Sequence, residues 1–147
     1  MTTISIIENS NIFNSQCQTI VNTINCIGIP EKGLSLIFKE QYPDMFEKYK
    51  GYCDKGFIEI GKLWLYKNEE KWILNFPIKK DYQNTFEYDY IEKGLQKFLE
   101  TYKEKNITSI AFPILGATNN CLDKNKILEK MLKYFSQCQD IIIEIYI

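Results

Sequence analysis

The sequence contains no histidine and no arginine, and all 18 of its basic residues are lysine. Without histidine, a Ser-His or Cys-His nucleophile pair is impossible, and a structural zinc site is disfavoured. We therefore expect neither a bound metal nor a cofactor. Without arginine, a phosphate group has to be held by backbone N–H groups, hydroxyls or lysine, because no guanidinium fork is available.

Long apolar runs, an export signal and a basic charge excess are missing as well. No stretch of 18 apolar residues exists, which predicts that nothing spans a membrane. The formal net charge is −1, whereas a protein that binds nucleic acid mainly through its backbone usually carries a basic excess. Residues 1–10 do not resemble a signal peptide. An odd number of cysteines without a C-x-x-C pair then predicts reduced thiols and a cytoplasmic protein: Cys17, Cys26, Cys53, Cys121 and Cys138.

The chain of 147 residues has the length of one ordinary domain, and 45% hydrophobic residues are enough for a folded core. Strand-like and helix-like patterns alternate along it. This alternation predicts an α/β fold with a mixed, largely parallel sheet flanked by helices on both faces. We expect strands at 3–7, 18–24, 58–66, 71–78, 108–115 and 140–147, a hairpin tip at 67–70, and helices at 33–50, 86–105 and 124–137, the last capped by Asp123.

Three segments carry polar residues at the carboxyl ends of predicted strands, where ligands bind in such folds. In 21–38 a strand leads through a glycine-containing loop into a helix, whose N-terminus suits a phosphate. In 112–123 a core strand ends in small, turn-prone residues that let backbone N–H groups face a ligand. On the local pattern alone, the alternative for 21–38 is an ordinary strand–loop–helix connection, which such a short glycine loop favours, and the alternative for 112–123 is an ordinary tight turn before a helix.

The third segment, 73–81, places two lysines directly after a strand. A strand-end lysine can serve as a nucleophilic amine, and Lys79 and Lys80 could influence each other through repulsion. The competing interpretation is a pair of solvated surface lysines.

Taken together and in order, the motifs resemble the macro domain family over nearly the whole chain. The similar branch contains the DNA ADP-ribosyl glycohydrolase antitoxins and the human terminal ADP-ribose glycohydrolase. The motifs that carry the resemblance are VNTINCIG at 21–28, K-G-x-x-x-x-F-K at 32–39, YP at 42–43, NFPIKK at 75–80, FPILG at 112–116 and LD at 122–123.

The resemblance implies one macro domain over 1–147 with a cleft for ADP-ribose or a related NAD-derived nucleotide. Lys79 matches the lysine proposed as the nucleophile, and Asn25 matches the second asparagine of the family's NTVN motif, beside the distal ribose. The other ligand contacts that it implies are Asn11 and Ile12 near the adenine, Asn22 of the same motif, Lys32 and Gly33 in a first phosphate-side loop, and Gly116, Ala117, Thr118, Asn119 and Asn120 in a second.

The loops depart from the family pattern. Glu31 replaces a glycine of the first loop, and a carboxylate pointing inward would repel a diphosphate. Thr118 and Asn120 stand in a loop that is glycine-rich in relatives, and one human relative has a catalytic acid where Asn120 stands. Ile78 replaces a threonine.

Three functions remain open at this point. The first is a metal-free glycohydrolase that removes ADP-ribose from DNA bases or acidic protein side chains through Lys79, as an antitoxin, a repair enzyme or a phage counter-defence protein. The alternative is a non-catalytic binder of ADP-ribose, or of another NAD-derived nucleotide, that serves as sensor, sponge or reader. The third is a fold used only for protein contacts.

Overall fold

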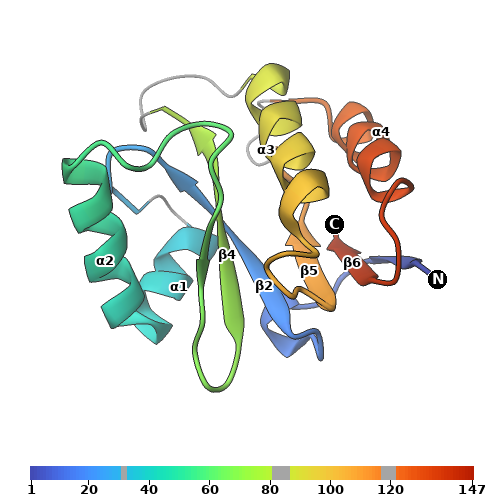
Figure 1. Cartoon of the computed structure of the whole chain (residues 1–147), viewed down its shortest axis with the longest axis horizontal. Coiled ribbons are helices and arrows are strands. Elements are labelled where there is room, and N and C mark those ends of the chain that lie inside the picture. The colour runs from blue at the N-terminus through green and yellow to red at the C-terminus, as the bar shows by residue number, and fades with distance from the viewer. Residues whose placement is uncertain (31–32, 81–86, 117–121) are drawn as a thin grey trace.

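The computed structural model describes residues 1–30, 33–80, 87–116 and 122–147. Its centre is a six-stranded sheet in the order β1-β6-β5-β2-β4-β3 (Figure 1). The strands are β1 (Thr3–Ile7), β2 (Thr19–Asn25), β3 (Trp64–Tyr66), β4 (Trp72–Lys79), β5 (Ser109–Pro113) and β6 (Ile142–Tyr146). The helices are the 3-10 helix η1 (Ile12–Asn14), α1 (Leu34–Gln41), α2 (Pro43–Asp54), α3 (Tyr88–Thr101) and α4 (Lys124–Phe135).

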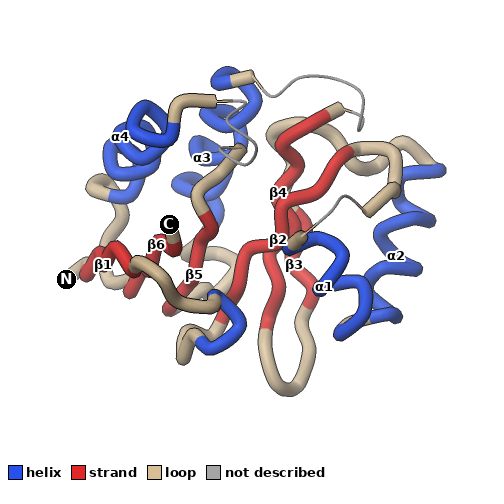
Figure 2. The backbone as a smooth tube through the Cα atoms, turned by 180° about the vertical axis from the view of Figure 1, so that it is seen from behind, coloured by secondary structure: helices blue, strands red, loops and turns tan. Residues whose placement is uncertain are grey.

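The predicted mixed, largely parallel sheet is confirmed. All neighbouring strands pair in parallel except β3 and β4, which pair antiparallel as the two arms of the predicted hairpin. Helices cover both faces, with α1 and α2 on one side of the sheet and α3 and α4 on the other (Figures 1 and 2). The described strands and helices therefore form three layers, as the alternating sequence pattern predicts.

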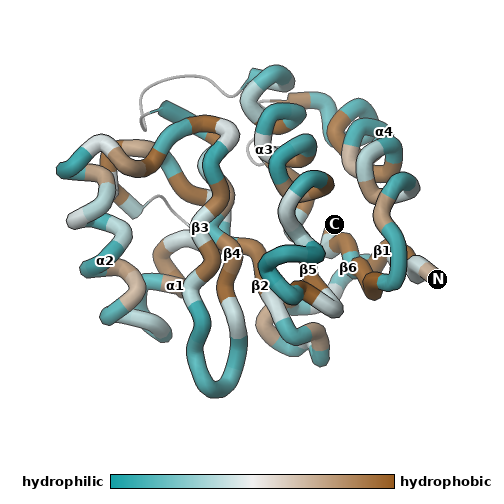
Figure 3. The backbone as a smooth tube through the Cα atoms, viewed as in Figure 1, coloured by the Kyte–Doolittle hydropathy of each residue, from teal (hydrophilic) through white to brown (hydrophobic). Residues whose placement is uncertain are grey.

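The face under α3 and α4 is continuously apolar. Phe98 of α3 and Phe135 of α4 meet Phe112 of β5 at ring-centroid distances of 5.2 and 4.7 Å, respectively. Phe76 of β4 adds a fourth ring at 6.3 Å from Phe112. Figure 3 shows α3 and α4 in alternating hydrophobic and hydrophilic bands, as expected of helices that bury one stripe against a sheet. Asp123 caps α4 as predicted, accepting hydrogen bonds from the N–H groups of Asn125 and Lys126.

The single helix predicted over 33–50 is wrong, because the structure has two helices there. The break lies at Tyr42, whose φ of −131° and ψ of 67° are not helical. The ring of a proline disfavours the helical conformation of the residue before it, and Pro43 follows Tyr42. Pro43 then opens α2 at a position where its missing N–H costs nothing.

The strand predicted over 58–66 is also too long. Only Trp64–Tyr66 pairs with β4, and the preceding residues turn, with Gly61 at a positive φ of 84°. This connection contributes Ile58 to the apolar contacts of α2 rather than a strand to the sheet.

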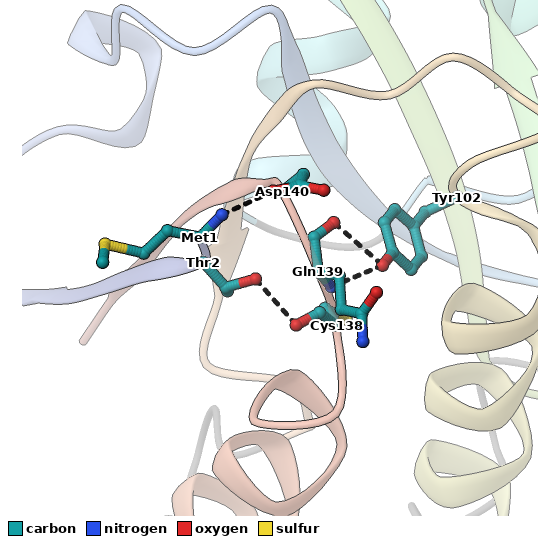
Figure 4. A network of polar contacts seen from close by, with 6 residues as sticks. All are labelled: Met1, Thr2, Tyr102, Cys138, Gln139 and Asp140. Atoms are coloured by element: carbon teal, nitrogen blue, oxygen red, sulfur yellow. Dashed lines mark hydrogen bonds and ion pairs between the residues drawn. The ribbon is translucent and has the colours of Figure 1, made fainter.

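A polar network ties the connection before β6 to its neighbours (Figure 4). The Tyr102 hydroxyl donates to the Gln139 carbonyl at 3.1 Å and accepts from the Gln139 N–H at 2.6 Å. Thr2 donates to the Cys138 carbonyl at 2.7 Å, and the Met1 amino group pairs with Asp140. The network lies where β1 and β6 begin, away from the carboxyl ends of the strands. Within the described parts of the chain, no helix combines the length and apolar character needed to cross a membrane.

Candidate functional site

The candidate site is built on a register shift between β2 and β4. Ile24 lies opposite Pro77, but the next residue, Asn25, lies opposite Lys79. Ile78 is therefore the extra residue of a bulge, and Pro77 sits beside it, a position that tolerates the missing N–H of proline. The shift brings the two residues predicted to be catalytic into direct register at the carboxyl ends of two adjacent strands.

Two neighbouring lysines differ sharply in exposure at this strand end. Lys79 is buried, with 9% of its surface exposed. Lys80 is exposed, and its ammonium group lies 5.5 Å from the ring centroid of Tyr90 on α3. The interpretation of both as solvated surface lysines is wrong for Lys79. A buried lysine at a strand end is uncommon in proteins, which singles this residue out.

Asn25 organises the loop that follows β2. Its Oδ1 accepts hydrogen bonds from the backbone N–H groups of Ile27, Gly28 and Ile29 at 3.2, 3.1 and 3.4 Å. Its Nδ2 donates to the Ile29 carbonyl at 2.6 Å. The Asn25 side chain, which the family resemblance predicts beside a ribose, therefore holds its own loop in shape.

The same loop is fixed to β4 and α2. The Cys26 N–H donates to the carbonyls of Lys79 and Lys80 at 3.1 and 3.3 Å. Gly28 has a φ of +82°, and a Cβ at this position would lie 3.3 Å from the Cα of Lys50 on α2. Only glycine combines this backbone conformation with so close an approach at no steric cost.

Two thiols and one phenol around the loop are held in their neutral forms. Burial raises the pKa of the Cys26 thiol to about 11 and that of the Cys53 thiol to about 12. Burial, with Cys53 nearby, also raises the pKa of the Tyr49 hydroxyl far above its usual range. Thiols with a raised pKa are poor nucleophiles, so burial disfavours Cys26 and Cys53 in that role.

Beneath the loop lies a buried pair of asparagines in register on β2 and β4. Asn22 donates to Asn75 at 3.0 Å, and Asn75 donates to the Trp64 carbonyl at 3.3 Å. Asn22 Oδ1 is buried, and nothing in the described part of the chain donates to it. Asn22 of β2 was predicted to contact the ligand. Its side chain is instead buried between the sheet and the layer of α1 and α2, with only 4% of its surface exposed.

The remaining predicted ligand residues lie in three places. Asn11 caps η1 by accepting from the Phe13 N–H at 3.0 Å, and Ile12 is buried against α1 in a cluster with Phe38. Gly33 precedes α1 with a φ of 85°, and Gly116 follows β5 with a φ of 68°. Lys32, Glu31 and the loop residues Ala117, Thr118, Asn119 and Asn120 lie outside the described residues.

Sequence reasoning missed two residues of this region. Tyr49 falls on the apolar spacing of the helix predicted over 33–50, yet its hydroxyl donates to the backbone carbonyl and Oδ1 of Asn25 at 2.7 and 2.9 Å. Asn75 begins the NFPIKK motif, which does not reveal its partners. The available signal was chemical, because a tyrosine or an asparagine on an apolar stripe needs a hydrogen-bond partner when buried.

No group of three or more Cys, Asp or Glu side chains is placed to hold a metal ion among the described residues.

Comparison with known proteins identifies relatives of this architecture. A DNA ADP-ribosyl glycohydrolase of Mycobacterium tuberculosis is 34% identical over 140 residues, which are 92% of this chain and 40% of the relative. A counterpart in Thermus aquaticus is 29% identical over 140 residues and is covered to 39%. The chain thus spans about two fifths of the length of these curated relatives.

Solved structures agree closely with the fold. The macrodomain of Thermus aquaticus DarG superposes with a TM-score of 0.94 at 26% identity, covering 100% of this chain and 99% of that chain. Thermosipho africanus DarTG in complex with ADP-ribose superposes with a TM-score of 0.91 at 31% identity, covering 98% and 41%. The sequence model of the macro domain family matches residues 21–131 of this chain. This chain belongs to the macro domain family.

Proposed function

We propose that residues 1–147 act as one macro domain that binds ADP-ribose and hydrolyses its glycosidic bond to a DNA base, with Lys79 as the nucleophile. The observation that carries the proposal is the bulge that sets the buried Lys79 opposite Asn25 at the carboxyl end of the sheet. Relatives named DNA ADP-ribosyl glycohydrolase support the reaction, and a similar structure with bound ADP-ribose supports the ligand.

The proposed chemistry needs one amine and one water molecule. The Lys79 nitrogen attacks the anomeric carbon of the distal ribose through its lone pair, and the bond from that carbon to the base breaks as the base takes up a proton from the attacking nitrogen. Ring opening yields a protonated Schiff base on the lysine. Water hydrolyses this Schiff base, which restores the amine and releases ADP-ribose.

A buried position suits this role for geometric reasons. Attack requires the amine to lie about 3–3.5 Å from the anomeric carbon in a fixed direction. A lysine in the sheet layer next to the Asn25 loop is held more firmly than one in solvent, such as Lys80. Because the chain lacks arginine, we assign the diphosphate to backbone N–H groups and lysine in the loops around Gly33 and Gly116.

The relatives are DNA ADP-ribosyl glycohydrolases, which favours DNA over protein as the carrier of the ADP-ribose group. Action on DNA in the cytoplasm is part of this proposal. The chain spans only part of those relatives, so pairing with an ADP-ribosylating toxin, as in the fusion protein of Thermosipho africanus, is part of this proposal.

The test compares Lys79→Ala with Lys80→Ala on an ADP-ribosylated single-stranded oligonucleotide. We expect Lys79→Ala to abolish release of ADP-ribose while keeping the fold and the affinity for free ADP-ribose, and Lys80→Ala to keep turnover. Borohydride reduction during turnover should convert the Schiff base on Lys79 of the unsubstituted protein into a stable amine, which mass spectrometry detects as an adduct on this residue. Wild-type turnover in Lys79→Ala would remove this lysine as the nucleophile.

Two further measurements separate the enzyme from a non-catalytic binder. Turnover should survive EDTA, and loss on chelation would contradict the lysine mechanism. Calorimetric titration with ADP-ribose should show binding. Binding without turnover on any ADP-ribosylated DNA or protein would establish the sensor, sponge or reader function, which the substituted loop residues Glu31 and Asn120 favour.

A further inference from the structure

We propose that Tyr49 of α2 is a positioning residue for the nucleotide site, acting through Asn25 and the loop at 26–29. The part of this inference that concerns catalysis rests on the proposed glycohydrolase function. The part that concerns the shape of the loop does not depend on it.

The first step is the arrangement of the Asn25 amide. Its Oδ1 faces the N–H groups of Ile27, Gly28 and Ile29, and its Nδ2 faces the Ile29 carbonyl. Rotating the amide by half a turn would point its NH₂ group at three donors and its oxygen at an acceptor. The loop therefore fixes which end of Asn25 points in which direction.

The second step is the tyrosine hydroxyl. A phenol has one hydrogen to donate, and the Tyr49 oxygen lies 2.7 Å from the Asn25 carbonyl and 2.9 Å from Asn25 Oδ1. The hydrogen is thus shared between the backbone and the side chain of one residue. This contact fixes Asn25 relative to α2 as well as relative to its own loop.

The third step is that the tyrosine is rigid and remains a donor. Only 4% of its surface is exposed, and it packs with Ile24 and Ile58. The Phe46 ring meets it edge-on at a centroid distance of 6.0 Å. Its raised pKa keeps the hydroxyl protonated throughout the physiological range.

The consequence is a chain of contacts from α2 to the strand end that carries Lys79. Tyr49 holds Asn25, Asn25 holds the loop, and Cys26 of the loop binds the carbonyls of Lys79 and Lys80. The N–H groups of Ile27, Gly28 and Ile29 point at Asn25 Oδ1, inside the loop. The loop serves the site through its shape, which Tyr49 maintains.

The experiment removes one oxygen atom. Tyr49→Phe keeps the ring and its packing, and Tyr52→Phe makes the same change on the same helix, at a hydroxyl that has no hydrogen bond to the described residues. Ile58→Val serves as a second control, because it loosens the apolar contacts around Tyr49 without touching a hydrogen bond. All three proteins are compared with the unsubstituted chain well below their melting temperatures.

Three readouts are measured. We expect Tyr49→Phe to weaken ADP-ribose binding about tenfold and to lower the single-turnover rate on an ADP-ribosylated oligonucleotide by a similar factor. Hydrogen exchange at the amides of 27–29 should become about tenfold faster. Tyr52→Phe and Ile58→Val should leave all three readouts unchanged, even where Ile58→Val lowers the melting temperature.

A lower melting temperature of Tyr49→Phe with unchanged exchange at 27–29 and unchanged affinity would overturn the proposal and make Tyr49 an ordinary core residue. If the unsubstituted protein binds ADP-ribose without turnover, only the glycohydrolase function fails, and exchange and affinity still decide on Tyr49. If it binds no ADP-ribose, exchange decides alone. If Tyr49→Phe does not fold, the Tyr49 hydroxyl proton is sought by NMR in the unsubstituted protein, and rapid exchange of that proton with solvent would refute the contact.

Discussion

The two faces of the sheet are built from different chemistry. The face under α3 and α4 buries one continuous apolar cluster of interlocking phenylalanine rings, such as Phe98, Phe112 and Phe135. The face under α1 and α2 has two smaller apolar clusters, and between and beside them lie the polar groups of Asn22, Asn25 and Asn75.

This division separates stability from function. Buried apolar area gives roughly 25 cal/mol per Å², whereas buried amides contribute little net stability and cost free energy when left unpaired. The apolar face can therefore supply the stability that allows the other face to keep polar groups such as Asn22 Oδ1, which nothing in the described ranges satisfies. Changes on the two faces should then have different effects.

The largest expected effect is on the apolar face. Phe98→Ala removes a ring that contacts Tyr102, Phe112 and Phe135, and should lower the free energy of unfolding by about 3–5 kcal/mol. Urea denaturation measures the change, with the half-buried neighbour Leu99→Ala as the control of smaller effect. The folded fraction should bind ADP-ribose normally. Weakened binding by the folded protein would show that the two faces are coupled.

A smaller loss of stability with a larger loss of function is expected at Gly28. Gly28→Ala forces a side chain into a positive φ and against Lys50, at a cost of about 1–3 kcal/mol. Because the loop must shift, ADP-ribose binding should weaken as well.

The matched control for Gly28→Ala is Gly56→Ala, at the end of α2. Gly56 has a similar φ of +74°, but no atom lies within 4 Å of the added Cβ. Calorimetry should show normal ADP-ribose affinity for this control despite its backbone strain. Equal loss of affinity in both variants would mean that strain in general, and not the shape of the loop, weakens the site.

The same division explains what the sequence could predict. Periodic apolar patterns determine the strands and the amphipathic helices, so the order of elements and the covered sheet were predictable. The break at Tyr42 was predictable in principle from Pro43, but the apolar spacing from Leu34 to Tyr49 runs across it and favoured one helix.

The site was predictable only in part. The motifs give the positions of Asn25 and Lys79, and parallel strands bring their carboxyl ends together. Hydrogen-bond partners depend on packing between elements far apart in the sequence. No local sequence pattern therefore reveals that the Asn25 amide binds the N–H groups of its own loop, or that it contacts Tyr49 of α2.

The smallest expected effect is a loss of stability at alkaline pH that arises on the face under α1 and α2. Burial raises the pKa of Cys26 from an ordinary 9.0 to about 11, with Glu59 adding to the rise and Lys80 opposing it. Burial likewise raises the pKa of Cys53 to about 12. Above pH 9 the unfolded chain releases these protons while the folded chain keeps them, so stability is full below pH 9 and falls as the pH rises toward 11 and 12.

Urea denaturation between pH 8 and 10 should show this decline in stability, and the decline should be shallower in the double variant Cys26→Ala/Cys53→Ala. Burial also raises the pKa of Cys138, on the face under α3 and α4, to about 11, so Cys138 contributes in the same direction. Cys138→Ala therefore measures how much of the alkaline loss of stability comes from that face. A slope that depends on Cys138 alone would place the alkaline weakness on the apolar face and reverse the comparison.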